Sequence, residues 1–349
     1  MRTTLPAIVM LCGWATLAAA QADAPETVVQ ALMSDDAATR QAAEADAVRL
    51  GAPMVKPLCD LMAKGDTRSV TVAEKALFAI AAAASGNEEA RAHLAWALAQ
   101  QAYGASSDRA QAYALRLLGL LGDLQTGHRI AGRLVKAPTF DEARAALERI
   151  DDPALNEVLE HMISHVPVER QPDVIRSLGA HRQRSAVPFL LTLARARERP
   201  DWRPAALDAL GMIADPSAAV VLAEAADDPD EAIRSAAIAA LIALADAEQQ
   251  RGGPLARRCY RKALDHAVTR GQHAAALIGL SQTDPSMRMQ WLLKGMGEGH
   301  TRRLAQAELL KTEAAQLAGP LYQRMSEAQG EELEALRGLA GAKGIAVSE

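Results

Sequence analysis

The sequence AVPFLLTLARARERPDWRPAALDALGMIAD, residues 186–215, returns 31 positions later as SAAVVLAEAADDPDEAIRSAAIAALIALAD, residues 217–246. At this shift similar residues coincide: Leu191 and Leu222, Arg203 and Arg234, Ala206 and Ala237, Ala209 and Ala240, Leu210 and Leu241, Ile213 and Leu244, and Asp215 and Asp246. A fixed period between about 20 and 50 residues is typical of a repeat architecture. The stretch therefore predicts a chain built from repeated units.

Each copy has the pattern of two short helices separated by a turn. The first helix is expected over residues 187–195 and 218–226, and the second over residues 204–213 and 231–245. One copy cannot bury its apolar side chains alone, so neighbouring copies must stack against each other. We therefore expect an all-α fold, a right-handed α-α superhelix that forms an elongated solenoid.

The composition agrees with helices that pack closely. Half of the residues are apolar but only 3% are aromatic, so the helices must pack mainly through Ala, Leu, Val and Ile. Alanine is the best helix former, and alternating apolar β-branched runs are nearly absent, which favours helices over sheets. The length of 349 residues predicts roughly ten helix pairs. The formal net charge of −5 disfavours a nucleic-acid partner, which would require a basic domain.

The first twenty residues have the pattern of a secretory signal peptide. Arg2 lies near the amino terminus, residues 7–17 form an apolar run too short to cross a bilayer, and three alanines precede Gln21. We expect cleavage before Gln21, a periplasmic or secreted protein, and no membrane span after cleavage. A retained membrane anchor is the alternative.

The expected mature chain has two cysteines, Cys59 and Cys259. Residues this far apart in a linear array lie several repeats from each other, whereas a disulfide needs Cα atoms within about 7 Å. Free cysteine commonly behaves as a small apolar residue. We therefore expect two buried free thiols.

The repeat pattern weakens toward both ends of the chain. We expect the main array over residues 21–250, divergent helical repeats over residues 251–341, and a flexible tail over residues 342–349. Between the clear copies and the amino terminus, one of the further helices is expected over residues 131–136.

The turn DDPD, residues 227–230, followed by IRSAAIAAL, residues 233–241, resembles a HEAT repeat and, more narrowly, the bacterial HEAT-like repeats also found in phycobilin lyases. In such repeats an acid in the turn precedes an arginine at the start of the second helix, which lines the concave face. Arg203 and Arg234 match this position, and Arg40 and Arg68 match it more loosely. The resemblance implies a binding role. CYRKAL, residues 259–264, also resembles a tetratricopeptide repeat, an alternative that changes the curvature and not the binding role.

Sequence motifs of enzymes are missing from the chain. It has no Gly-x-Ser-x-Gly motif and no phosphate-binding loop. His161 and His165 lie four positions apart in an expected helix, but a metalloprotease would have Glu at the position of Met162. We therefore interpret them as surface histidines and expect no catalytic residue, no cofactor and no metal. A lyase-like HEAT enzyme is the catalytic alternative.

Charge alternates in blocks along the middle of the chain. Residues 170–203 have eight arginines against three acids, residues 204–248 have nine acids against one arginine, and residues 251–270 have six basic residues against one acid. Blocks of one sign can orient a partner, although a solvated helix face is the simpler interpretation. The candidate partner-binding residues are Arg195, Arg199, Arg203 and Arg234.

Two of these arginines lead to a specific hypothesis. Arg203 and Arg234, one repeat apart, would form a ladder in the groove, with Asp201 and Asp230 in the turns holding their side chains. Alternatively, each arginine bridges to the acid of its own turn and stabilises the stack. The expected function is an exported scaffold or adaptor that binds another protein. A regulatory solenoid with a small molecule in its groove is the alternative.

Overall fold

The computed structural model describes residues 24–105, 107–251 and 254–346. Within them the chain forms twenty α-helices, α2 to α21, five short 3-10 helices and no strand. This confirms the all-α prediction and agrees with the expected ten helix pairs. None of the described helices is both long and apolar enough to cross a membrane. The predicted signal peptide lies outside the described residues.

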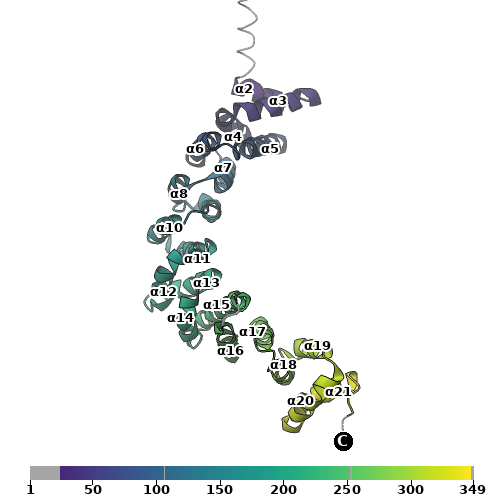
Figure 1. Cartoon of the computed structure of the whole chain (residues 1–349). Coiled ribbons are helices and arrows are strands. Elements are labelled where there is room, and N and C mark those ends of the chain that lie inside the picture. Colours follow the sequence, from purple (N-terminus) through teal and green to yellow (C-terminus); the bar gives the residue numbers. More distant parts are fainter. Residues whose placement is uncertain (1–23, 106, 252–253, 347–349) are drawn as a thin grey trace, which may run out of the picture. The chain divides into compact units, whose positions relative to one another are not determined.

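The chain divides into two compact units, the first ending at Pro167 and the second beginning at Val168 (Figure 1). The first unit contains α2 (Pro25–Leu32), α3 (Ala37–Leu50), α4 (Val55–Ala63), α5 (Thr67–Ala84), α6 (Glu88–Gly104), α7 (Asp108–Leu121), α8 (Leu124–Ala131), α9 (Phe140–Leu147) and α10 (Leu155–Ile163). Polar side chains begin several of these helices: Asp36, Asp66, Asn87, Ser107 and Asp123 each accept a hydrogen bond from a backbone amide of the first turn. Such caps satisfy amides that the helix itself leaves without a partner.

One helix of the first unit differs from the prediction. The helix expected over residues 131–136 is instead α8, which ends at Ala131 and is followed by turns. Asp123 caps its start through the amide of Thr126, at 2.9 Å, so the helix begins seven residues earlier than expected. The expectation was wrong because it gave no weight to Asp123 as a cap.

The second unit contains the clearest repeats. Its helices are α11 (Gln171–Ala180), α12 (Val187–Arg195), α13 (Trp202–Ile213), α14 (Ala219–Ala225), α15 (Glu231–Gln250), α16 (Leu255–His266), α17 (Arg270–Thr283), α18 (Arg288–Gly297), α19 (Arg302–Leu310), α20 (Ala314–Glu327) and α21 (Gly330–Ala342). We call α12, α14, α16, α18 and α20 its first helices and α13, α15, α17, α19 and α21 its second helices. The predicted division at residue 250 lies inside this unit, where α15 packs on α16.

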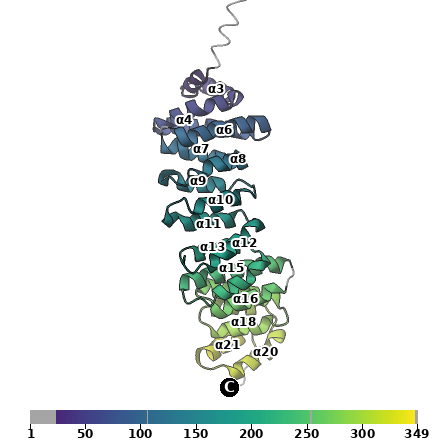
Figure 2. The ribbon, with the colours of Figure 1, turned by 90° about the vertical axis from the view of Figure 1, so that its left-hand side faces the viewer.

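Helix α11 and the second helices α13 and α15 pack directly against one another, and Figure 2 shows them as successive layers. The contacts are unusually close because a glycine on one helix meets an alanine on the next. A Cβ added to Gly179 would lie 2.5 Å from the Cα of Ala209, and one added to Gly211 would lie 2.8 Å from the Cα of Ala240. The main chains therefore nearly touch, which explains how the unit packs with so few aromatic residues.

Leucines fill the space around these glycine contacts. Leu210 and Leu241, which coincide in the repeat, are 0% and 1% exposed. Both point into the core between neighbouring helix pairs, as the period predicted.

Both cysteines are buried and free, as expected. Burial raises the pKa of the Cys59 thiol to about 12 and that of the Cys259 thiol to about 11. Since the thiolate is the reactive form, both residues act as small apolar side chains at neutral pH.

Candidate functional site

Arg203 lies at the start of α13 and joins two repeats. Its Nε donates a hydrogen bond to the carbonyl oxygen of Ala194, at 3.0 Å, within its own repeat. Its terminal nitrogen pairs with Asp228 of the next repeat, at 2.8 Å, and the two side chains are only 14% and 16% exposed. Burial raises the pKa of Asp228, but the amide of Asp230 and the Arg203 guanidinium outweigh it and hold that pKa below its usual value. The charge of Arg203 is thus largely used within the stack.

Arg234 reaches the same turn by a different route. It donates to the carbonyl oxygens of Asp228, at 2.8 Å, and Pro229, at 3.3 Å. The expected acid, Asp230, instead caps α15 by accepting the amides of Ala232 and Ile233. Backbone amides that the helix leaves without a partner thus occupy the Asp230 carboxylate, which makes it unavailable to Arg234.

The predicted pairing of the ladder is therefore wrong in its acids. Asp228, and not Asp201, binds Arg203, and Asp201 accepts from Arg199 at 3.3 Å. The structure brings Arg203 and Arg234 together at the turn that contains Asp228. Arg203 binds the carboxylate of Asp228, and Arg234 binds its main-chain carbonyl oxygen.

The other two candidate arginines have different surroundings. The guanidinium of Arg199 lies 3.8 Å from the centre of the Trp202 ring. The side chains of Arg199 and Trp202 both donate to the Oε1 atom of Gln171, at 2.6 Å and 3.0 Å, and so tie α13 to α11. The Arg195 side chain is 57% exposed and lies 3.9 Å from Glu224, so it is the most solvated of the four.

The same turn contacts recur where the sequence match is looser. Arg40 donates to the carbonyl oxygens of Ser34 and Asp35, six and five residues before it, as Arg234 does in its own turn. Arg68 pairs with the Asp35 carboxylate at 2.8 Å.

A further turn arginine, Arg302, was missed by the sequence analysis. It donates to the carbonyl oxygen of Met296 at 3.0 Å and pairs with Glu331 of the next helix pair at 3.2 Å. This repeats the two bonds of Arg203. The only signal in the sequence is an arginine that begins a second helix, with an acid one repeat later. We refer to Arg40, Arg68, Arg203, Arg234 and Arg302 as the turn arginines.

Replacing Arg203 with Gln is expected to lower the free energy of unfolding of the second unit by about 1–2 kcal/mol, because it leaves a mostly buried carboxylate without its cation. Arg195→Gln is the matched control and should change it by less than about 0.5 kcal/mol, since Arg195 is an exposed surface arginine. Chemical denaturation of the two variants measures both.

The pH dependence adds a second check on Arg203. The pKa of Asp228 is lower in the folded than in the unfolded protein. Its ionised form therefore contributes to the free energy of unfolding above the unfolded pKa of about 3.9, and this contribution is lost as the pH falls through the folded pKa. The difference between wild type and Arg203→Gln should therefore be constant near neutral pH and shrink below about pH 4. A difference that grows on acidification would contradict the assignment of Asp228 as the partner.

The two histidines of the sequence analysis lie side by side at the end of α10. The ring centroids of His161 and His165 are 4.4 Å apart, and the Nδ1 atom of His165 lies 2.9 Å from the carbonyl oxygen of His161. Across the described parts of the chain, no three His, Cys, Asp or Glu side chains are grouped so that they could hold a metal ion.

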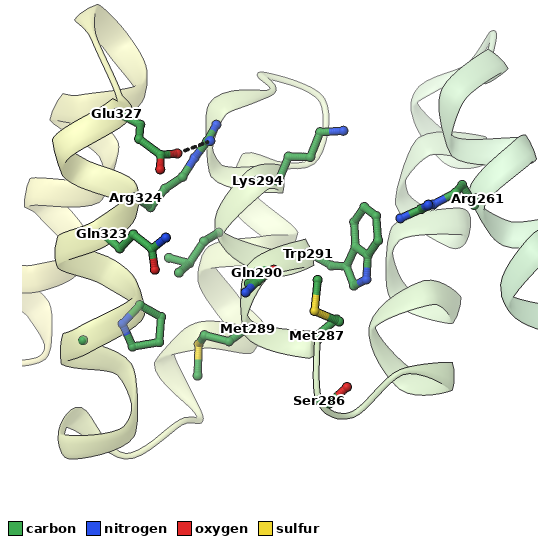
Figure 3. Close-up of a pocket in the computed structure, with 13 residues that line it drawn as sticks. Arg261, Ser286, Met287, Met289, Gln290, Trp291, Lys294, Gln323, Arg324 and Glu327 are labelled. Carbon is green, nitrogen blue, oxygen red and sulfur yellow. Dashed lines mark ion pairs between the residues drawn. The ribbon is translucent and has the colours of Figure 1, made fainter.

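The second unit has a pocket of about 610 Å³ on its first helices α16, α18 and α20 (Figure 3). Arg261 comes from α16 and lies at one end, and Gln323, Arg324 and Glu327 come from α20 at the other. Helix α18 and the residues before it supply the middle. The apolar lining consists of Met287, Met289, Trp291, Leu293 and Pro320.

Of the three basic side chains that line this pocket, one is paired with carboxylates of the residues that the structure describes and two are not. Arg324 pairs with Glu332 at 2.6 Å and with Glu327 at 3.5 Å. Arg261 and Lys294 lie 4.9 Å and 5.9 Å from the centre of the Trp291 ring, and neither has an ion pair with a carboxylate of the described residues. The pocket therefore has an aromatic centre with two available positive charges beside it.

Sequence analysis did not find this pocket. Its residues come from three successive helix pairs in the part of the chain where the repeat is weakest. The only local signal is SMRMQW, residues 286–291, which concentrates two methionines and a tryptophan in a chain with 11 Met and 4 Trp.

A second hollow, of about 570 Å³, lies along the second helices α13 and α15. Asp208, Met212, Ala239, Ala243 and Gln250 line it, together with Arg182 from the segment after α11. Met212 is 43% exposed, so a large apolar side chain reaches solvent in this hollow.

Comparison with known proteins finds a similarity in the middle of the chain. A family model described as HEAT repeats matches residues 158–242, which include most of the two copies that predict the fold. A crystal structure of a Kap121p mutant is similar at 12% sequence identity and a TM-score of 0.36, over 95% of this chain and 45% of that chain. This chain thus spans less than half of that protein's length. No curated protein matches this chain.

Proposed function

We propose that this protein is a scaffold or adaptor that binds another protein through its HEAT-like helix pairs. The supporting observation is the hollow on α13 and α15, which overlaps the end of the segment that matches HEAT repeats. The glycines, alanines and leucines between the helices are buried in the stack, and the turn arginines bind groups of the turns. The hollow remains open, and its lining includes the exposed Met212 together with Asp208 and Arg182. Stacked helical repeats commonly use such surfaces to bind proteins.

Site-specific cross-linking tests this function. A photoreactive benzoylphenylalanine at Met212 should cross-link to one main protein in cells of the native organism. The matched control is the same residue at Val220, which is 63% exposed on the first helix α14 and outside the hollow. Cross-linking at Met212 and not at Val220 supports the scaffold.

The second candidate is a regulatory solenoid with a small molecule in this groove. Its supporting observation is the size of the hollow, which lies within the usual range of about 300–1,000 Å³ for ligand pockets. Native mass spectrometry of the purified protein distinguishes the two. A stoichiometric small-molecule adduct, without a protein cross-link at Met212, would favour the ligand over the scaffold.

We also propose that the role is not enzymatic, and that a lyase-like activity is the catalytic alternative. Incubation of the purified protein with a bilin and a thiol-containing acceptor protein tests this alternative directly. Covalent transfer of the pigment to the acceptor would contradict the scaffold proposal and show that the protein is an enzyme.

We further propose that the protein is exported and acts in the periplasm or outside the cell. The support is the amino-terminal sequence, with Arg2, an apolar run over residues 7–17 and small residues up to Ala20. Mass spectrometry of the protein from the periplasmic or secreted fraction should show a chain that begins at Gln21. Recovery of a chain with an intact Met1 from the membrane fraction would support the retained anchor instead.

A further inference from the structure

We propose that the pocket on α16, α18 and α20 binds an acidic peptide segment of the partner protein, in which one or two apolar side chains are flanked by Asp or Glu. This rests on the proposed scaffold function, and it names the chemistry that the partner would present. The pocket lies on the first helices and is separate from the hollow on α13 and α15. The two sites can therefore be tested independently.

The lining of the pocket suits a large apolar side chain. A volume of about 610 Å³ is enough for two or three side chains of a peptide. Met287 and Met289 supply flexible, polarizable surfaces that adapt to different shapes, and Trp291 supplies a flat one. Figure 3 shows these three side chains between the basic residue of α16 and the polar residues of α20.

The available charges select an acidic ligand. Arg324 pairs with both Glu327 and Glu332, so that end of the pocket has one carboxylate in excess. At the other end Arg261 and Lys294 supply two positive charges beside Trp291, and the lining as a whole remains positive. Both are exposed and flank the same indole ring. A carboxylate placed there would pair with either cation while the adjacent apolar residue contacts Trp291. A basic segment would be repelled.

Uncharged polar groups favour a peptide over a lipid or another simple amphiphile. The side-chain amides of Gln290 and Gln323 line the pocket and make no hydrogen bond within the described part of the chain. Amide side chains can both donate to and accept from a peptide main chain. An acyl chain offers these amides no hydrogen-bonding group.

The indole nitrogen of Trp291 provides a further observation. Its Nε1 atom has no contact with solvent and no hydrogen-bond acceptor. A buried donor without an acceptor is costly, and native structures contain few of them. Figure 3 shows the Met287 side chain beside the ring. Rotation of this flexible side chain would let a main-chain or carboxylate oxygen of the peptide reach Nε1.

The test uses a fluorescein-labelled dodecapeptide with a central Leu-Phe pair and five acidic residues on each side. We expect saturable binding to the full protein by fluorescence anisotropy, weakening several-fold between 50 and 300 mM NaCl because the charges are exposed. A peptide with Lys in place of the acids, and one with Ser-Ser in place of Leu-Phe, should each bind at least about ten-fold more weakly.

Variants of the pocket locate the binding. Arg261→Gln and Lys294→Gln should each weaken binding about two- to five-fold, as expected for exposed charge pairs. Trp291→Leu should weaken it about ten-fold or more, because a central aromatic anchor is lost. Arg258→Gln is the matched control, on the same helix as Arg261 and outside the pocket, and should bind like wild type. Circular dichroism shows that each variant is folded.

Hydrogen exchange with and without the peptide supplies a second readout, which does not depend on variants. Protection should appear in α16, α18 and α20. Protection elsewhere, or equal binding by wild type and the Arg261 and Lys294 variants, would overturn the proposal. Tighter binding to phosphatidylglycerol vesicles, with the same dependence on Arg261, would identify a lipid surface and overturn it too. A protein cross-link at Met212 without peptide binding would reject this inference alone and leave the scaffold in place.

Discussion

Replacing Leu210 with Ala should lower the free energy of unfolding of the second unit by about 2–5 kcal/mol, the largest single effect that we expect in this chain. The side chain is 0% exposed in α13, which packs on both α11 and α15. The neighbouring helices cannot close the resulting cavity, because their main chains already meet at Gly179 and Gly211. The substitution therefore removes apolar contacts and leaves an empty space.

The control for Leu210 is Leu310, a leucine of the same unit that is 40% exposed at the end of α19. Leu310→Ala should change stability by no more than about 0.5 kcal/mol. Hydrogen exchange should show that Leu210→Ala weakens protection in α11, α13 and α15, while α4 and α5 of the first unit keep theirs, because each repeat depends mainly on its neighbours. Equal loss of protection in both units would contradict this local stability.

Gly179→Ala and Gly338→Ala should change stability in opposite directions, although both place alanine in a helix. Alanine is the better helix former by about 1 kcal/mol. At Gly338, on α21, a Cβ has nothing within 4 Å, so this gain should appear as a stabilisation of about 0.5–1 kcal/mol.

At Gly179 the new Cβ would lie 2.5 Å from the Cα of Ala209 and 2.8 Å from its Cβ. Those atoms belong to the neighbouring helix and cannot rotate away, so α11 and α13 must separate. Overpacking of this kind costs about 1–3 kcal/mol or more, which exceeds the gain in helix propensity. Thermal and chemical denaturation should place the two variants about 2–4 kcal/mol apart. A stabilised Gly179→Ala protein would show that the helices are not in close contact.

The period of 31 residues was sufficient to predict most of the fold. Helix α12 has the predicted bounds, Val187–Arg195, and the two repeat leucines are buried where the period placed them. Helix α15 runs to Gln250, five residues beyond the expected end. The residues there, including Glu248 and Gln249, are good helix formers, and no glycine occurs between Glu231 and Arg251 to end the helix earlier.

The contacts of the candidate site could not be predicted from the same period. A repeat shows that Arg203 and Arg234 occupy equivalent positions, but not which of several nearby acids each one binds. That choice depends on Asp230, which caps a helix, and on Asp228, which is left facing the arginine of the preceding repeat. The pocket around Trp291 was missed for a related reason, since it is built by residues of three helix pairs with no shared sequence pattern.

The glycine and alanine contacts also have a mechanical consequence. Where α11, α13 and α15 meet, their spacing is set by main chains, which cannot be compressed, and not by side chains that can change rotamer. The row formed by these three helices therefore acts as the neutral axis of the stack. When these repeats bend, the spacing of α11, α13 and α15 therefore stays constant, and the distance between α12 and α14 changes.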